Sequence, residues 1–356
     1  MMSMKNIDNG KKSLKVGRSK DGHPLRMRVD GITIVSMVDG KREKNTIRDW
    51  VKNIMGMTEH YSVEPVYHKK NGKNHYQKGV KISSGSTMLV RIDYKPYRDN
   101  VGNIRFEFRP QHLTENGMNK LILWLAESGL ADLIFTIFKR AWVTRLDVAL
   151  DVYNCTLEDY FFGLKRCYTG NMNLEGDSRG LTLGTVYSHL QMSIYEKTDL
   201  FGVESSIEKV ETLGKNILRV DEYADFLRIE ARIRPKNTPH SKQANRAIRL
   251  ADLDKLVNPF ESLQIYHKGL DNMLHGTDNR FSYKKGHTLA RNKHDFLKRI
   301  GARKMPKHQE KVFKQYEYEL LNKGEVWSFW PDCKAKLGLL GNPPLWVATN
   351  RNRYFS

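Results

Sequence analysis

Hydrophobic and polar positions alternate with period two in four short segments of this chain, a pattern typical of β-strands with one covered face. The segments are residues 104–109, 143–151, 191–197 and 226–234. In each of them, aliphatic or aromatic side chains occupy one face, while acidic, basic or tyrosine side chains occupy the other. The pattern predicts an α+β fold whose mixed or antiparallel sheet has one helix-covered face and one open polar face.

The polar faces of three of these strands carry the candidate chemistry. At about 3.3 Å per residue, Asp147 and Asp151 lie about 13 Å apart along their strand, so they share no ligand unless the strand bends. Asp147, nearer the middle of its strand, is the stronger candidate. An ordinary half-exposed strand explains any single segment equally well. The candidates on the polar faces are Arg145, Asp147, Asp151, Tyr195, Lys197, Arg228, Glu230, Arg232 and Arg234.

Helical periodicity supplies a cover for the apolar face of the sheet. Apolar residues at helical spacing predict a helix over residues 45–57 and a longer helical stretch over 113–140 that breaks at Gly129. A short helix is predicted over 157–168. Further strands are predicted at 28–37, 79–83, 87–94 and 181–187.

Composition indicates a polyanionic partner. The chain has 356 residues and a formal net charge of +20, and such an excess of lysine and arginine favours nucleic acid. The three cysteines show no zinc-binding spacing. We expect a cytoplasmic protein with reduced thiols and no membrane association, because no apolar run has the length of a membrane span.

The distribution of charge and proline predicts three regions. Residues 1–27 read as a flexible basic tail, residues 28–235 as the catalytic domain, and residues 236–356 as a basic, mainly helical DNA-binding lobe. The lobe holds 23 Lys and Arg against 11 Asp and Glu. Its predicted helices are 242–256, 260–274, 293–300 and 307–321. The candidate DNA-binding residues are Arg232, Arg234, Lys242, Arg246, Arg249, Lys293, Arg299, Arg303 and Lys304.

Aromatic residues near the end of the chain allow two interpretations. Trp327, Phe329, Trp330 and Trp346 could stack on nucleic-acid bases. Packing in a hydrophobic core is the more common use of tryptophan.

A tyrosine that shares a polar face with carboxylates and cations fits nucleophilic attack on a phosphodiester. A metal ion held by the carboxylates would stabilise the charge that develops on the phosphate, and a nearby lysine or arginine would assist the tyrosine. The product is a covalent phosphotyrosine. A phosphate-binding sheet without catalysis is the alternative that these residues alone leave open.

The segments Thr144–Asp151, Ser193–Lys197 and Leu227–Arg232 occur in an order that resembles the replication initiation factor family (Rep_trans) of rolling-circle initiators, most closely its filamentous-phage branch. Residues 29–34 resemble the opening strand of that family, and the resemblance runs from about residue 29 to 235. Glu196 stands where Asp or Asn is expected, and the spacer 198–226 is long.

The resemblance implies a site-specific nickase and strand transferase that leaves a 3′-OH for a host polymerase. It implies that Tyr195 is the nucleophile, with Asp147 and Glu230 as metal ligands. Asp151, on the same strand face as Asp147, is a further candidate ligand. Arg145, Lys197 and Arg228 would assist catalysis. Because these ligands are hard oxygen donors, Mg²⁺ or Mn²⁺ is the expected cofactor.

The expected partners are duplex and single-stranded DNA, together with a host helicase and polymerase, and a homodimer stays open. No His-hydrophobe-His motif of the other large class of rolling-circle nickases occurs. A tyrosine on a strand argues against the tyrosine recombinases, whose site is helical. The alternative function is a non-catalytic DNA-binding regulatory protein of a phage or plasmid, which would have no use for Tyr195.

Overall fold

A computed structural model describes the greater part of the chain and divides it into two compact units. Unit 1 comprises Met1–Met27, Ala149–Arg232 and Asn258–Phe329, and unit 2 comprises Arg28–Val148, Ile233–Val257 and Trp330–Ser356. Strands β3 and β8 contribute residues to both units. The described residues are 6–8, 13–55, 59–68, 75–98, 101–165, 167, 170–173, 180–199, 224–236, 247–267, 311 and 314–346.

Unit 2 is built on a sheet with the strand order β8-β3-β7-β6-β5-β4. The pairings from β3 through β7, β6 and β5 to β4 are all antiparallel. The predicted strands are present, and β4 is an additional one. The bounds are β3 Pro24–Ser36, β4 Ser62–Tyr67, β5 Tyr76–Ser84, β6 Thr87–Pro96, β7 Ile104–Phe108 and β8 Trp142–Tyr153.

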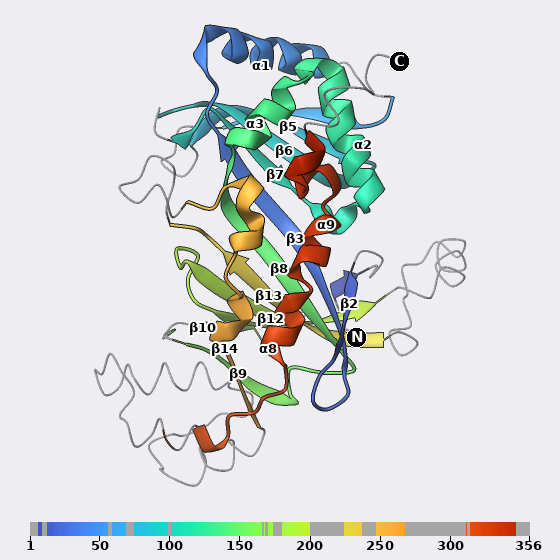
Figure 1. Ribbon diagram of the computed structural model, residues 1–356, viewed down its shortest axis with the longest axis vertical. Helices are drawn as coiled ribbons and strands as arrows, with labels where there is room; N and C mark the ends of the chain where they lie inside the picture. Colours follow the sequence, from blue (N-terminus) through green and yellow to red (C-terminus); the bar gives the residue numbers. More distant parts are fainter. Residues whose placement is uncertain are drawn as a thin grey trace. The chain divides into compact units, whose positions relative to one another are not determined.

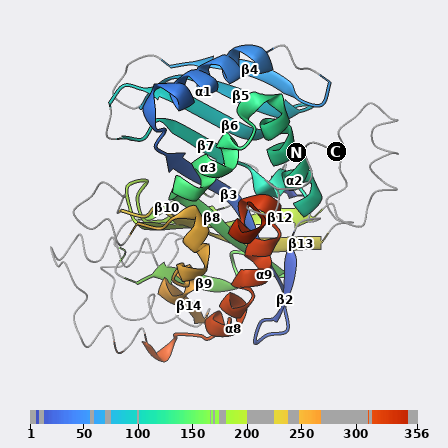
Figure 2. The same cartoon turned by 45° about the horizontal axis from the view of Figure 1, so that its top comes forward.

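Three helices cover one face of this sheet, as the periodicity predicted (Figures 1 and 2). They are α1 (Gly40–Ile54), α2 (Glu115–Leu125) and α3 (Leu133–Arg140), and a short π-helical turn, η3 (Ala126–Leu130), follows α2. The chain bends at Gly129, whose φ of 119° suits glycine and breaks the helical stretch at the predicted place. The apolar stripe of α1 is buried.

The bend divides this helical stretch into two helices that are each short. Among the described residues, no single helix is long and apolar enough to cross a membrane. Residues 115–130 and 133–140 pass such a test only together, and a bend of 117° separates them.

The C-terminal tryptophans of unit 2 pack in its core. Trp330 begins α9 (Trp330–Ala335), and its indole Nε1 donates to the Leu253 carbonyl at 2.9 Å. Trp346 rests on Phe138 and donates to the carbonyl of Leu339, in the short 3-10 turn η8 (Gly338–Leu340). Both indoles are buried, so core packing is the correct interpretation for these two residues. The turn that holds Leu253 is η6 (Leu250–Lys255), and η2 (Pro110–His112) precedes α2.

Unit 1 contains a sheet with the strand order β10-β11-β12-β13-β8 and a separate antiparallel pair, β14 and β9. Strand β1 pairs with β12 in parallel, which makes the sheet mixed, and β2 pairs with the start of β3. The bounds are β1 Asn6–Asp8, β2 Leu14–Arg18, β9 Tyr160–Leu164, β10 Gly170–Asn173, β11 Gly180–Leu183, β12 Leu190–Asp199, β13 Ala224–Ile233, η7 Pro259–Ser262, β14 Leu263–His267 and α8 Lys323–Ser328.

The predicted α+β class is confirmed, but the local structure differs from the sequence interpretation in two places. Residues 14–27 form an antiparallel pair of strands, and so they are not part of a flexible tail. The helix predicted over 157–168 is replaced by β9. Its apolar residues pair with β14, where Phe162 faces Ile265 and Leu164 faces Leu263, and this non-local pairing overrides the local pattern.

The predicted C-terminal lobe is not a compact body of its own, because residues 236–356 are distributed over both units. The helix predicted over 260–274 is wrong in its described part, where η7 and β14 lie. Within 242–256 the described residues contain the short η6 turn and no α-helix. Within 307–321 the described residues 311, 314 and 315 are helical, whereas 316–321 are not. The helix predicted over 293–300 lies outside the described residues.

Candidate active site on strands β12 and β13

Strand β12 places Tyr195 on its polar side, as its alternation predicted. Met192 and Ile194 are fully buried in the core, while Tyr195 and Lys197 are half-buried. Strand β11 pairs with β12 on one side and β13 lies on the other. The strand that carries Tyr195 therefore has a neighbouring strand of unit 1 on each side.

Tyr195 and Glu230 are in direct contact. The Tyr195 hydroxyl donates to Glu230 Oε2 at 2.8 Å. The second carboxylate oxygen, Oε1, accepts from Arg232 Nη2 at 3.0 Å. Arg232 Nη1 also lies 3.5 Å from Gln191 Oε1, a marginal contact. The strand periodicity also predicts that Tyr195 lies within reach of the carboxylates of Asp147 and Glu230. The contact with Glu230 agrees with that prediction, whereas the part that concerns Asp147 stays a prediction. Glu230 is oriented by a guanidinium on its far side.

Lys197 adds a positive charge next to the tyrosine. Its ammonium lies over the Tyr195 ring, 5.6 Å from the ring centroid, within the range of a cation–π contact. A positive charge at this position stabilises negative charge on the phenol oxygen. Lys197 can therefore assist a nucleophilic tyrosine without bonding to the substrate.

A glycine leaves space next to Tyr195 on the opposite strand. Gly180 of β11 is the cross-strand partner of Tyr195, and a Cβ added to Gly180 would lie 3.1 Å from the Tyr195 Cβ. That approach is closer than two packed carbon atoms normally allow, so an alanine would press on the tyrosine. Gly180 was not a sequence candidate, although a glycine inside a strand often marks such an approach.

Glu196, the residue that departs from the family pattern, faces away from the tyrosine cluster. Its Oε1 accepts a hydrogen bond from the Leu157 amide at 3.1 Å. The carboxylate thus fixes the turn that follows β8. Because Glu196 follows Tyr195 directly on the strand, its side chain is expected on the opposite face, and this contact agrees with that expectation.

Asp151 and Arg228 form a buried ion pair in unit 1. Arg228 Nε and Nη2 donate to the two oxygens of Asp151 at 2.6 and 2.7 Å. The two side chains are 0% and 1% exposed. Contrary to the sequence interpretation, Arg228 does not lie on an open face and cannot touch DNA in this structure. Asp151, with each oxygen engaged by a guanidinium nitrogen, does not fit the role of metal ligand.

Asp147 belongs to unit 2, where Arg145 holds it. Arg145 Nε lies 3.0 and 2.9 Å from the two carboxylate oxygens, and Nη2 lies 2.5 Å from Oδ2. Gly31 of β3 leaves room for this carboxylate, because a Cβ there would lie 3.3 Å from Asp147 Oδ2. Asp147 is buried and Arg145 is half-buried, so this carboxylate lies beneath its arginine.

The described carboxylates do not form a ready set of metal ligands. No group of three or more His, Cys, Asp or Glu side chains in the described part of the chain is arranged to hold a metal ion. Guanidinium nitrogens contact oxygens of Asp147, Asp151 and Glu230 alike. In the described residues these carboxylates are thus held by guanidinium groups, and dependence on Mg²⁺ or Mn²⁺ stays a prediction from the sequence.

The candidate DNA-binding residues differ in their exposure and contacts. Arg232 donates to Glu230, and Arg234 is half-buried. Arg249 is exposed, and its backbone forms an antiparallel β-bridge with that of Trp142. The remaining candidates, Lys242, Arg246, Lys293, Arg299, Arg303 and Lys304, lie outside the described residues.

Two other tyrosines, Tyr153 and Tyr187, lie in the same unit and are the alternatives to Tyr195 as a nucleophile. Tyr153 is buried and stacks on Phe226, with ring centroids 5.0 Å apart. Tyr187 is 90% exposed in the turn between β11 and β12. The Tyr195 hydroxyl donates to the carboxylate of Glu230, so this tyrosine has an acceptor in place for its proton.

Comparison with known proteins yields one structural likeness. No family model matches the sequence, and no curated protein matches it either. Among solved structures, a rolling-circle replication initiator protein from Geobacillus stearothermophilus aligns with 78% of this chain and 96% of its own length. The two share 17% sequence identity with a TM-score of 0.34, and at that similarity the likeness carries no argument about function.

Proposed function

We propose that this protein is a DNA nickase and strand transferase that initiates rolling-circle replication, with Tyr195 as the nucleophile. The observation that carries the proposal is the 2.8 Å hydrogen bond from the Tyr195 hydroxyl to the carboxylate of Glu230. The net charge of +20 supports a DNA substrate, and the order of the three strand motifs supports this reaction class.

In the proposed reaction, the Tyr195 oxygen attacks the phosphorus of the scissile phosphodiester. Its proton passes to Glu230 Oε2, which already accepts that proton in a hydrogen bond. The bond between phosphorus and the 3′ oxygen breaks, and that oxygen takes a proton from water. The products are a 5′-phosphotyrosine on the protein and a free 3′-OH on the DNA.

Two positively charged side chains on β12 and β13 assist this step. Arg232 holds Glu230 Oε1, so the carboxylate keeps its other oxygen directed at the phenol. Lys197 stabilises the negative charge that develops on the Tyr195 oxygen. Arg232 is therefore a positioning residue, and Lys197 assists the attack.

Rejoining of the strand is the reverse of this reaction. A 3′-OH attacks the phosphotyrosine and gives its proton to water, and the protonated Glu230 returns its proton to the departing Tyr195 oxygen. A host polymerase would extend the 3′ end between the two steps, with a host helicase unwinding the template, and both partners are part of the proposal.

The test is a covalent-adduct assay on the full chain. An end-labelled single-stranded oligonucleotide that carries the nick site is incubated with protein and Mg²⁺ and run on a denaturing gel. The wild type should give a shifted protein–DNA band, and Tyr195→Phe should give none. Tyr153→Phe and Tyr187→Phe are matched controls that also remove one phenolic oxygen, and both should keep the band. A band that survives in Tyr195→Phe would refute the proposal.

A chelator gives the second arm of the same assay. The hard oxygen ligands of the sequence predict that cleavage stops in excess EDTA and returns with Mg²⁺ or Mn²⁺. Full cleavage in EDTA would remove the metal from the proposal and leave Glu230 as the proton acceptor.

The alternative is a non-catalytic DNA-binding protein. It would bind DNA through its basic surface, and Tyr195→Phe would change nothing measurable. The absence of any covalent adduct from wild-type protein, over a library of single-stranded sequences with Mg²⁺ present, would favour this alternative.

A further inference from the structure

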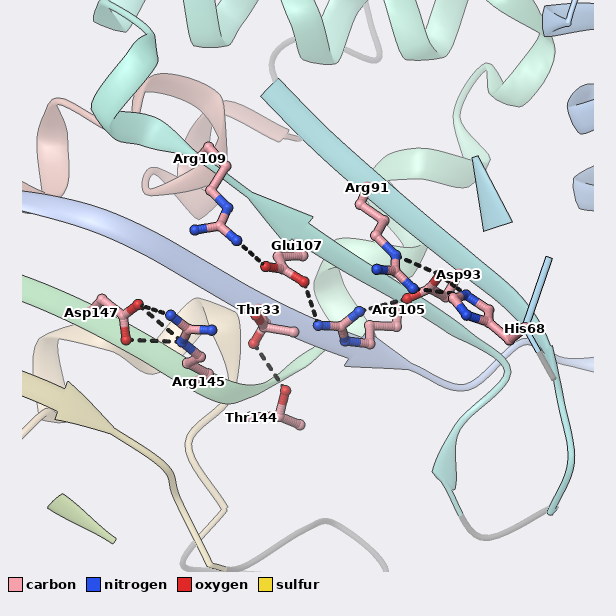
Figure 3. A network of polar contacts seen from close by, with 10 residues as sticks. All are labelled: Thr33, His68, Arg91, Asp93, Arg105, Glu107, Arg109, Thr144, Arg145 and Asp147. Carbon is pink, nitrogen blue, oxygen red and sulfur yellow. Dashed lines mark hydrogen bonds and ion pairs between the residues drawn. The ribbon is translucent and has the colours of Figure 1, made fainter. Parts of the chain in front are cut away.

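The polar face of the unit 2 sheet carries acidic and basic residues in a checkerboard (Figure 3). Along β7 the order is Arg105, Glu107, Arg109. In the antiparallel register of β6, Asp93 faces Arg105 and Arg91 faces Glu107. Opposite charges therefore alternate both along the strands and across them.

Direct contacts link these residues into one network. Asp93 accepts from Arg91 Nε at 3.0 Å and from Arg105 Nη1 at 2.5 Å. Glu107 accepts from Arg105 Nη2 and Arg109 Nη2, both at 2.6 Å. Each carboxylate thus holds two guanidinium groups and fixes their orientation.

The two kinds of charge lie at different depths. The side chains of Arg91 and Arg109 are each 29% exposed, whereas that of Asp93 is 3% exposed. Gly79 makes this depth possible for Asp93, because a Cβ there would lie 2.5 Å from Asp93 Oδ1. The part of this network that reaches the surface is therefore mainly arginine.

The same arrangement recurs on β8 of this unit. Arg145 is 28% exposed above Asp147, which is 3% exposed. Only β3 separates β8 from β7 in this sheet. Burial raises the pKa of Glu107, and the charge of Arg145, after those of Arg105 and Arg109, helps to lower it. Four arginines, Arg91, Arg105, Arg109 and Arg145, hence form one surface, which we call the arginine face.

Arg105 and Arg109 have more N–H donors than their contacts to the carboxylates use. A guanidinium has five N–H donors. The contacts of Arg105 to carboxylates use its two terminal nitrogens, and that of Arg109 uses one. Phosphate is the ligand that a fixed guanidinium fork matches best, because the fork can donate two parallel hydrogen bonds.

We propose that the arginine face binds the phosphate backbone of single-stranded DNA, independently of sequence. The buried carboxylates preorganise the guanidinium groups, so little side-chain entropy is lost on binding. A flexible single strand can follow such a face over several phosphates, whereas a stiff duplex would present fewer of them. The choice of DNA as the polyanion rests on the proposed function.

The test uses full-length protein that carries Tyr195→Phe, so that binding is measured without cleavage. The ligand is a single-stranded oligothymidylate, which lacks a nick site, and its affinity is measured over a range of salt concentrations. Arg109→Gln is the informative variant, since Glu107 keeps Arg105 as a partner. Loss of one phosphate contact should lower the slope of log K against log salt by about 0.7.

A matched control removes the same charge elsewhere in unit 2. Lys52 is exposed on α1, one of the helices that cover the other face of the sheet, and Lys52→Gln should leave the slope unchanged. Equal slopes for Arg109→Gln and Lys52→Gln would overturn the proposal. If Arg109→Gln unfolds at a lower temperature than the wild type, Arg109→Lys is the variant that tests the proposal. It keeps the charge but loses the fork, so its affinity should fall while its slope is retained, and an unchanged affinity would count against the proposal.

Two further outcomes distinguish this inference from duplex binding and from the nicking proposal. If a duplex of equal length loses more affinity than the oligothymidylate in Arg109→Gln, the occupant is duplex DNA and the proposal is wrong. The adduct assay tests Tyr195, whereas this salt titration tests Arg109. Failure of the nicking proposal would therefore leave the slope change intact, and failure here would leave the covalent adduct intact.

Discussion

Glu230 in unit 1 and Glu107 in unit 2 occupy similar positions with different partners. Each is a carboxylate on a strand, and each oxygen accepts from a different donor. Glu107 is held by two guanidinium groups, from Arg105 and Arg109. Glu230 accepts from a guanidinium, that of Arg232, and from a phenol, that of Tyr195. An arginine does not give up its proton at any ordinary pH, but a phenol can, and on this difference we base the proposal that Glu230 is a proton acceptor whereas Glu107 is structural.

The largest expected effect separates the two carboxylates by chemistry. Glu230→Gln should slow formation of the covalent adduct by about 10² to 10⁴, the usual contribution of a general base. Glu107→Gln, the same change in unit 2, should leave the single-turnover cleavage rate within about twofold once its folded fraction is accounted for. Rates are read from quenched gels at saturating protein. Equal losses in both variants would break the comparison.

The next effect concerns stability. The Arg228–Asp151 pair is buried, so Arg228→Met leaves an uncompensated carboxylate and should cost about 3 to 5 kcal/mol of unfolding free energy. The double variant Arg228→Met with Asp151→Leu removes both charges and should recover much of that loss. Urea denaturation measures both. If the single variant is as stable as the wild type, the pair is not desolvated.

Two glycines allow a smaller contrast between the units. Gly180→Ala should displace Tyr195 and slow cleavage severalfold with little loss of stability, since its Cβ would lie 3.1 Å from that side chain's Cβ. Gly79→Ala should instead destabilise by about 1 to 3 kcal/mol, because its Cβ would crowd Asp93 and the Ile92 carbonyl. Adduct formation and thermal melting are measured for both. A cleavage defect confined to Gly79→Ala would contradict the assignment of the site.

The smallest effect is a dependence of stability on acid pH. Burial raises the pKa of Glu107, but the charges of Arg105 and Arg109 outweigh it, and the pKa is lowered overall. A lowered pKa means that Glu107 stabilises the fold fully above the unfolded-state pKa of about 4.3 and loses that contribution as the pH falls through the lower folded value. Glu107→Gln should be less stable at neutral pH, and the difference should shrink in acid. Denaturation at several pH values measures it, and a difference independent of pH would refute this origin.

Much of the fold could be predicted because its signals are local. The alternation of β7, β8, β12 and β13, and the apolar stripe of α1, each reflect a single element packing against one core. The polar position of Tyr195 and its proximity to Glu230 followed from the same periodicity. The break at Gly129 was visible as a glycine in a helical run.

The rest depends on pairing between distant segments, which periodicity does not contain. Arg228 was expected on an open face, yet it is buried because Asp151, 77 residues earlier, meets it across the sheet. Strand β9 forms through β14, about a hundred residues later. The spaces beside Gly180 and Gly79 depend on which residue stands opposite, and that is set by register.

The checkerboard on β6 and β7 also constrains how the unit 2 sheet can assemble. If β7 slipped by one residue against β6, Asp93 and Arg105 would no longer be paired. All side chains of β7 would also change faces, so that Phe106 would leave the core and the charged residues would enter it. A slip of two residues keeps the faces but sets like charges opposite one another, Arg91 against Arg105. Misaligned pairings are thus penalised by burial in one case and by repulsion in the other. The same network of charges that orients the arginines therefore also favours the observed register of β6 and β7 over its neighbours.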